Sequence, residues 1–193
     1  MNFLAHSFLS FTDEQIVGNL IGDFIRNRDK KLLPEKIQQG VMLHRAIDAF
    51  TDVHPKVSEA KTVFQPLVRL YSGAFVDVCF DYFLANDKSI KSAKEWREFT
   101  AHVYKVLYQY EKNLPENFRQ VLPRMQQDNW LYNYRYDWGM EYSIRNVLHK
   151  ARFLEKNTPV YGLFIHHKPF LKECFDAFFP DLHEFCIKIN ETF

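Results

Sequence analysis

The chain has 193 residues, of which 47% are hydrophobic and 17% aromatic, so it can bury ample apolar surface and is not intrinsically disordered. Its 25 lysines and arginines nearly balance 24 aspartates and glutamates, which gives a formal net charge of +1. That balance argues against a protein that coats a phosphate backbone, so we expect no nucleic-acid partner. Glycine is scarce, which disfavours glycine-rich nucleotide-binding loops.

The cysteines and the N-terminal segment bear on the cellular compartment. Cys79, Cys174 and Cys186 are widely spaced and form no C-x-x-C pair, which indicates buried free thiols. The opening MNFLAHSFLSF has no basic residue before its apolar stretch and no small-residue cleavage site, so it is a poor signal peptide. No apolar run approaches the ~18 residues of a membrane helix. We therefore expect a cytoplasmic protein without a membrane partner.

Helical periodicity runs through nearly the whole chain, and strand signals are missing. A short helix is expected within residues 2–10. Longer helices are expected over residues 13–28, 34–52, 56–64, 66–86, 92–112, 115–127, 137–155 and 159–190, with breaks at Pro169 and Pro180. The pattern predicts one all-α domain over residues 1–193, a bundle of roughly seven to nine helices.

The helix over residues 34–52 carries a histidine and an aspartate where apolar residues are expected. At about 100° per residue, His44 and Asp48 share the inward-facing stripe that Ile37 and Val41 mark. A buried aspartate is costly unless it is paired or bound to a metal. The alternative to a metal is an internal hydrogen bond between the two side chains.

Asp77 and Asp81 repeat this pattern one turn apart on the apolar helix over residues 66–86. Two stacked carboxylates repel each other unless positive charge lies between them. A divalent cation is one solution, and ion pairs with Arg45 or Arg69 are the other.

Further candidates come from the N-terminal part of the chain. Asp23 follows Asn19 by one turn among apolar neighbours, and His6 stands in the apolar segment NFLAHSF. Taken alone, His6 is expected to be a core histidine with satisfied hydrogen bonds. It is a candidate metal ligand only as part of a set of such residues. The complete candidate set for metal ligation is His6, Asp23, His44, Asp48, Asp77 and Asp81.

This mixture of imidazole and carboxylate suits Mn²⁺, Mg²⁺ or Fe²⁺, and the lack of cysteine ligands argues against structural zinc. Facing helices of a bundle commonly build such sites. A metal held there can activate water and neutralise a phosphoryl oxygen, which points to phosphoester hydrolysis.

Four ordered motifs carry a resemblance to a known family: MNFLAH, GNLIGDF, HRAIDAFTD and DVCFDYF. Over residues 1–84 the chain resembles the acyl carrier protein phosphodiesterase family, and residues 130–152 are similar to it more weakly. The resemblance implies an all-helical, HD-domain-like fold related to metal-dependent phosphohydrolases. It also implies a Mn²⁺-favouring enzyme that removes 4′-phosphopantetheine from holo acyl carrier protein and leaves the apo protein.

The resemblance also implies roles for particular residues. The implied metal-site residues, with His6 close by, are Asp23, His44, Asp48, Asp77 and Asp81. Arg45 would offset phosphate charge, which completes a catalytic set of Asp23, His44, Arg45 and Asp48. The chain departs from the family at Tyr82, where members often have histidine, and it lacks the adjacent His-Asp pair of the wider superfamily. The number of metals therefore stays open.

Two surface features bear on the substrate. Acyl carrier proteins are small and acidic, so a basic cluster near the site would steer and orient such a partner. A cluster of this kind follows Asp23 in the sequence and consists of Arg26, Arg28, Lys30 and Lys31. A solvated loop is the alternative. An aromatic run either packs in the core or lines a groove for the pantetheine arm: Trp130, Tyr132, Tyr134, Tyr136 and Trp138.

Two other functions remain open on the sequence alone. One is a helical metal phosphohydrolase of a small phosphoester or nucleotide. The other is a non-catalytic helical protein with a structural metal site, which the departure at Tyr82 keeps in consideration.

Overall fold

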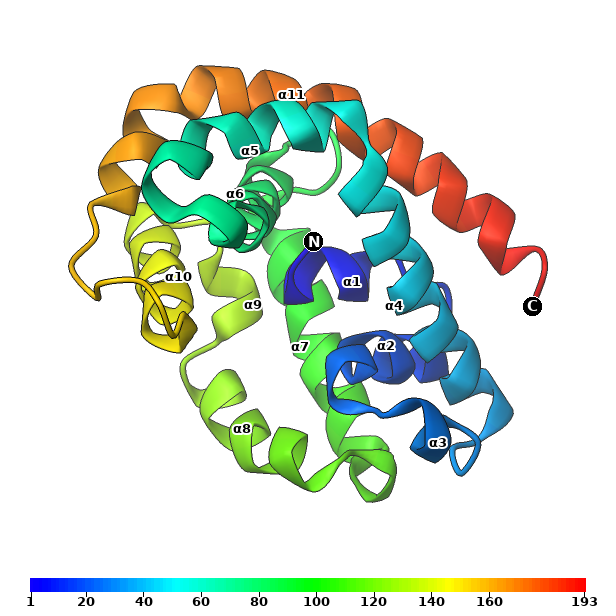
Figure 1. Cartoon of the computed structure of the whole chain (residues 1–193). Helices are drawn as coiled ribbons and strands as arrows, with labels where there is room; N and C mark the ends of the chain where they lie inside the picture. The colour runs from blue at the N-terminus through cyan, green and yellow to red at the C-terminus, as the bar shows by residue number, and fades with distance from the viewer.

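A computed structural model describes all 193 residues, and every regular element in it is helical (Figure 1). This confirms the all-α prediction. The α-helices are α1 (Phe3–Phe8), α2 (Asp13–Leu20), α3 (Asn27–Lys30), α4 (Glu35–Val53), α5 (Pro55–Val68), α6 (Ser72–Asn86), α7 (Ala93–Gln109), α8 (Glu116–Gln127), α9 (Trp130–Asn133), α10 (Asp137–Lys150) and α11 (Val160–Asn190). Short 3₁₀ turns lie at η1 (Gly22–Phe24), η2 (Arg69–Tyr71) and η3 (Glu111–Asn113).

The helix boundaries differ from the sequence prediction in several places, and the structure has eleven α-helices where seven to nine were expected. The helix expected over residues 13–28 ends at Leu20, and the chain turns through η1 before the single turn of α3. Pro66 lies inside α5 rather than opening α6, and the break falls at Arg69, whose φ is 50°. Pro169 and Pro180 lie within α11 and do not end it.

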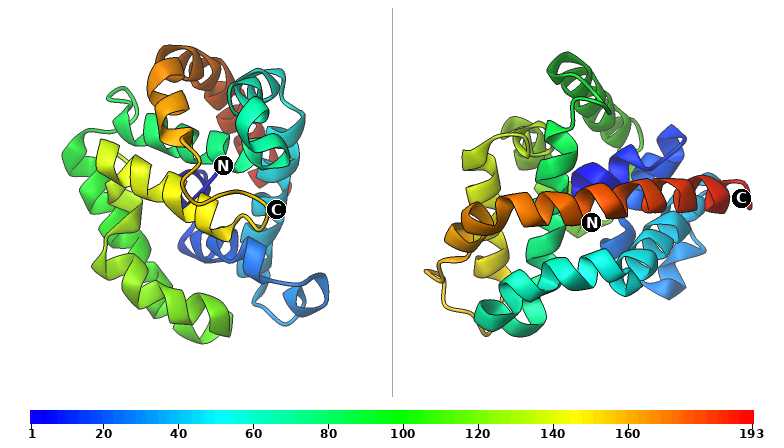
Figure 2. Two further views of the ribbon diagram at one scale, coloured as in Figure 1. Left: turned by 60° about the vertical axis from the view of Figure 1, so that its left-hand side comes forward. Right: turned by 90° about the horizontal axis from the view of Figure 1, so that it is seen from above.

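The long C-terminal helix α11 continues through its two prolines because the residues around them are held in place by packing. Phe175, Phe178 and Leu182 are buried against the rest of the molecule. Burial of such large side chains offsets the roughly 3 kcal/mol that an interior proline costs a helix. α11 runs along α5 across one side of the molecule (Figure 2).

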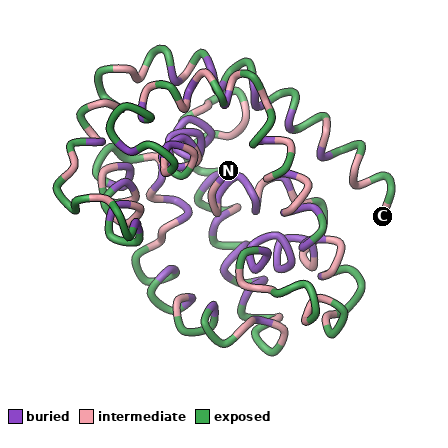
Figure 3. Tube along the Cα trace, viewed as in Figure 1, coloured by how far each residue is buried: buried purple, intermediate pink, exposed green.

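A single connected core holds 49 buried hydrophobic residues, which range along the chain from Met1 to Cys186. Buried segments concentrate in α1, α2 and α6 at the centre of the molecule, as Figure 3 shows. All three cysteines are free and buried, as the sequence predicted. None of the helices combines the length and the apolar character needed to cross a bilayer.

Helices α2 and α4 cross at very close range because each presents a glycine at the crossing. A Cβ on Gly18 would lie 2.0 Å from the carbonyl oxygen of Ile37, and one on Gly40 would lie 2.5 Å from that of Gln15. No other residue fits at either position without moving a helix. The crossing brings the C-terminal end of α2 beside the middle of α4, where His44 lies.

Helix α1 is fixed from its N-terminal end by a carboxylate of α6. Asp81 is fully buried and accepts hydrogen bonds from the backbone N–H groups of Asn2, Leu4 and Ala5 at 3.2, 2.8 and 3.3 Å. These are the N–H groups that a helix start leaves without partners. The contact sets α1 between α6 and the α2–α4 pair.

Candidate metal centre

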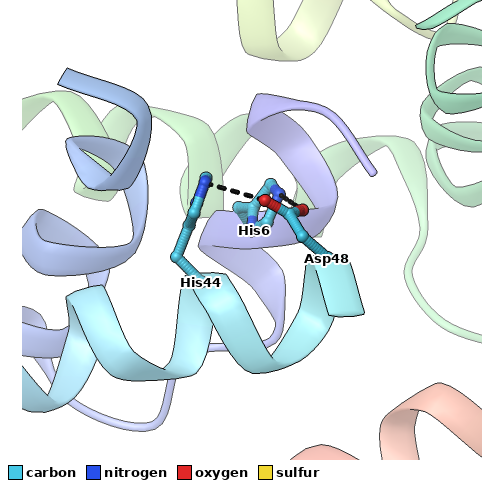
Figure 4. A group of neighbouring side chains, drawn as sticks. All are labelled: His6, His44 and Asp48. Carbon is cyan, nitrogen blue, oxygen red and sulfur yellow. Dashed lines mark ion pairs between the residues drawn. The ribbon is translucent and has the colours of Figure 1, made fainter. Parts of the chain in front are cut away.

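Three side chains from two helices meet at the junction of α1 and α4 (Figure 4). His6 comes from α1, while His44 and Asp48 lie one turn apart on α4. One potential ligand atom from each lies within 4.8 Å of the others. The Nε2 atoms of His6 and His44 lie 3.3 and 3.1 Å from the carboxylate oxygens of Asp48. The two imidazole rings stack, with centroids 4.1 Å apart and planes at 22°.

Asn19, on α2, holds both histidines through their Nδ1 atoms. Its side-chain oxygen accepts from His6 Nδ1 at 2.7 Å, and its backbone carbonyl accepts from His44 Nδ1 at 2.7 Å. The Asn19 amide nitrogen donates to the backbone oxygen of His6 and to Ser10 Oγ, so its orientation is fixed. Both histidines therefore carry a proton on Nδ1 and turn Nε2 toward Asp48.

Burial lowers the pKa of His6, so this histidine is neutral and its Nε2 carries a lone pair. That lone pair faces an oxygen of Asp48 at 3.3 Å, which places one acceptor against another. A cation between them would turn this repulsion into two favourable contacts. The donor set of two imidazole nitrogens and a carboxylate fits a divalent ion of borderline or hard character.

The charges around His44 are strongly coupled. Burial disfavours its imidazolium, but hydrogen bonds to Asp23 and Asp48 outweigh that cost and raise the pKa of His44 to about 9. Burial likewise opposes ionisation of Asp48, yet the hydrogen bond from His44 holds the pKa of that carboxyl well below its usual range. Without a cation, a proton on His44 supplies the positive charge that the carboxylates require.

Asp23 lies at the solvent side of the group, where its Oδ1 is 3.2 Å from His44 Nε2. Its side chain is 77% exposed, against 42% for Asp48 and 6% for His44. The hydrogen bond from His44 lowers the pKa of Asp23. Asp23 is therefore the most exposed of these side chains and lies on the solvent-facing side of the group.

Gly22, which precedes Asp23 in η1, allows this turn to pack closely against His44. A Cβ at Gly22 would lie 2.3 Å from His44 Cγ and 2.7 Å from Nδ1. The turn that ends α2 early therefore packs directly on the imidazole.

Asp77 and Asp81, both expected as ligands, are not brought to the histidines. Asp81 is engaged by the N-terminus of α1, and Asp77 accepts from the N-terminal ammonium at 2.9 Å. The positive partners that the stacked carboxylates required are thus an ammonium group and helix N–H groups. Burial raises the pKa of Asp81 to about 7, opposed by the nearby ammonium and by those hydrogen bonds. We therefore leave both residues out of the candidate ligand set.

The other expected residues lie around the group. Arg45 follows His44 on α4, is half-buried and has no ion-pair partner. Arg26 and Arg28 are exposed and both contact Asp29, at 3.0 and 3.5 Å. Lys30 is half-buried and Lys31 exposed, on the same segment after η1.

Tyr82, at the position where the family often has histidine, faces a different part of the molecule. Its hydroxyl donates to Asp137 Oδ1 at 2.8 Å and accepts from Lys168 Nζ at 2.5 Å. The pKa of Tyr82 is raised, chiefly by burial. The departure from the family pattern therefore leaves the three-residue group at the α1–α4 junction intact.

Sequence reasoning singled out Asn19 only for its spacing from Asp23, and it missed Gly22. A polar amide one turn before a candidate ligand was the available signal for Asn19. The contact of Gly22 with His44 had no sequence signal, because the two residues meet only after α2 crosses α4.

The fold and this site together define an all-helical protein with a histidine–aspartate group suited to a divalent cation. Residues 1–182 match the family model described as acyl carrier protein phosphodiesterase, so the chain belongs to that family. A Yersinia pestis protein named acyl carrier protein phosphodiesterase is 33% identical over 137 residues, which cover 69% of this chain and 70% of that protein. A protein of the same name from Escherichia coli O6:H1 is 30% identical over 154 residues, with 79% of each chain covered. No solved structure matches the chain.

Proposed function

We propose that this protein is a metal-dependent phosphodiesterase that hydrolyses 4′-phosphopantetheine from holo acyl carrier protein in the cytoplasm. Membership of the acyl carrier protein phosphodiesterase family supports the reaction. The observation that carries the metal dependence is the pair of histidines anchored through Nδ1 by Asn19, with both Nε2 atoms turned to Asp48.

In this proposal His6 Nε2, His44 Nε2 and the Asp48 carboxylate hold the cation, with Mn²⁺ as the first choice. When bound, the ion supplies a Lewis acid that activates water and neutralises charge on the phosphoryl oxygens. Asp23, at the solvent side, orients the attacking water and accepts its proton. Arg45, next to His44 in the sequence of α4, has no ion-pair partner and in this proposal offsets phosphate charge in the transition state.

The basic cluster of Arg26, Arg28, Lys30 and Lys31 docks the acidic carrier protein in this proposal. The segment directly follows η1, which contains Asp23, so a carrier bound there lies close to Asp23. Asp29 neutralises part of the arginine charge, which leaves the lysines as the unpaired cations.

The test is incubation of the purified protein with holo acyl carrier protein and Mn²⁺, followed by intact mass measurement of the carrier. We expect loss of the phosphopantetheine mass with metal and none after chelation. Asp48→Asn should abolish the loss, while Asp52→Asn, one turn further on α4 and exposed, should retain it.

Each other outcome rejects a named part of the proposal. An unchanged carrier mass with saturating metal rejects the substrate. Hydrolysis of small phosphodiesters alone favours a phosphohydrolase of a small phosphoester or nucleotide. Full activity in the presence of chelator rejects metal dependence, and metal binding without any hydrolysis favours a non-catalytic protein.

A further inference from the structure

A cavity of about 410 Å³ lies between the N-terminal end of α1 and the helices α8, α9 and α10. Its volume falls within the range of roughly 300–1,000 Å³ that small-molecule sites occupy. Trp130, Tyr134 and Trp138 contribute aromatic surface, and Ser143, Asn133 and Asn146 contribute polar groups. The wall therefore offers both apolar contact and hydrogen bonding, which is the usual composition of a small-molecule site, and Arg124, Asp128 and Lys150 add charged groups to it.

Tyr134 is the clearest sign that this cavity takes a ligand. Its side chain lines the cavity and the residue is only 6% exposed, yet the hydroxyl makes no hydrogen bond within the protein. Burial, with Asp81 and Asp77 nearby, raises the pKa of Tyr134 well above its usual range, so the hydroxyl keeps its proton and can donate. The indole N–H of Trp130, which also lines the cavity, is buried and has no hydrogen-bond partner. A ligand oxygen in the cavity would satisfy such unused donors.

The aromatic run that the sequence left open divides in two. Tyr132 and Tyr136 pack with Arg135, whose guanidinium lies 5.1 and 5.7 Å from their ring centroids, and do not line the cavity. Trp130, Tyr134 and Trp138 do line it. The run therefore divides into two residues that pack with Arg135 and three that line the cavity.

The cavity adjoins the candidate metal centre through α1. Phe3 lines the cavity, and His6 follows it by three residues on the same helix. Residues three apart are neighbours on one helix face and lie roughly 4.5 Å apart along the axis. The cavity wall at Phe3 and the candidate metal ligand His6 are therefore separated by about one turn of α1.

We propose that this cavity binds the pantetheine arm of the substrate, with the Tyr134 hydroxyl donating to an amide or hydroxyl oxygen of the arm. This inference rests on the proposed function. The arm is uncharged, flexible and rich in amides, and its methyl and methylene groups suit the tryptophan faces. Arg124 is paired with Asp128 at 3.4 Å, which reduces the net charge that the arm would meet.

Pantetheine without its phosphate is the direct probe, because its binding requires neither the metal nor hydrolysis. Calorimetric titration should detect binding to the wild-type protein. Tyr134→Phe, which removes only the hydroxyl, should weaken it about 3- to 10-fold. The matched control is Tyr108→Phe on α7, since Tyr108 is 37% exposed and lies outside this cavity. It should bind pantetheine like the wild type.

A second variant fills the cavity from α10, where Ser143 is half-buried and lines the wall. Ser143→Trp on α10 should abolish pantetheine binding and raise the KM for holo carrier at least 10-fold, with an unchanged helical circular dichroism spectrum and Mn²⁺ affinity. No wild-type binding at millimolar pantetheine, or wild-type binding by Ser143→Trp, overturns the inference. Pantetheine binding without hydrolysis of holo carrier keeps the cavity assignment and rejects the proposed function. Hydrolysis with an unchanged KM in Ser143→Trp rejects the cavity assignment alone.

Discussion

The imidazole rings of His6 and His44 stack at 4.1 Å, although one lies on the first helix and the other on the fourth. Asn19 joins them by accepting from both Nδ1 atoms. The rings therefore present their Nε2 atoms to Asp48 as one unit.

Replacing Asn19 should weaken metal binding more than it weakens the fold. Asn19→Leu keeps the side-chain volume but removes the acceptor that fixes the tautomer of His6, so Mn²⁺ affinity should fall about 10- to 100-fold. Titration calorimetry of the metal measures this. Ser10→Ala is the control, since it removes only the outer partner of the Asn19 amide and should change affinity far less. Unchanged Mn²⁺ affinity in Asn19→Leu would contradict the role of Asn19 in orienting the ligands.

The chelated protein should lose stability as the pH rises from neutral to alkaline. The pKa of His44 is raised from 6.5 to about 9 in the folded state. The protonated imidazole therefore contributes fully to the free energy of unfolding below pH 6.5, and this contribution is lost as the pH rises through 9. The loss should approach about 3 kcal/mol relative to His44→Gln, which lacks the titrating group. Urea unfolding of both proteins in chelator at pH 6, 7.5 and 9 measures the difference. Parallel pH profiles for the two proteins would refute the charge coupling of His44.

Gly22→Ala should damage the site through a single methyl group. The new Cβ would lie 2.3 Å from His44 Cγ, so the ring or η1 must shift. We expect a stability loss of about 1–3 kcal/mol together with reduced Mn²⁺ affinity. Gly162→Ala on α11 is the matched control, because nothing lies within 4 Å of its added Cβ. If Gly22→Ala binds metal as tightly as Gly162→Ala does, the packing of η1 on His44 is not what orients the ring.

Asp81→Asn should lower stability and leave Mn²⁺ affinity nearly unchanged. The amide loses one acceptor oxygen, and at least one backbone N–H of α1 is left without its partner, at a cost of about 1–3 kcal/mol. Denaturant unfolding and metal titration separate the two effects. A loss of metal affinity as large as that of Asp48→Asn would restore Asp81 to the ligand set.

Reversing charge in the basic cluster should weaken docking of the carrier protein. Arg26→Glu with Arg28→Glu should slow association with holo carrier at low salt, and the difference should shrink as salt screens it. Stopped-flow or surface binding at several ionic strengths measures this. Lys94→Glu with Lys105→Glu, on the exposed side of α7, is the control and should change the rate less. Equal effects of the two pairs would show that net charge alone matters.

Local patterns in the sequence were sufficient where one helix carries the information. His44 and Asp48 share a face of α4 because the spacing of four residues and the inward Ile37 and Val41 fix that face. The capping box of Ser92 and Glu95, which begins α7, is likewise a local pattern of a serine followed three residues later by a glutamate. Helical content throughout and buried thiols also follow from local composition.

Packing between distant segments decided the rest. Whether Asp81 would meet a cation or the N–H groups of α1 depends on where α1 docks, and no local pattern encodes that. The close crossing at Gly18 and Gly40 places Asn19 and Gly22 against His44, because only there can two helix backbones approach so nearly. Residue type and helical spacing indicate which side chains could bind a cation. Which of them meet depends on how the helices pack, since their contacts join helices far apart along the chain.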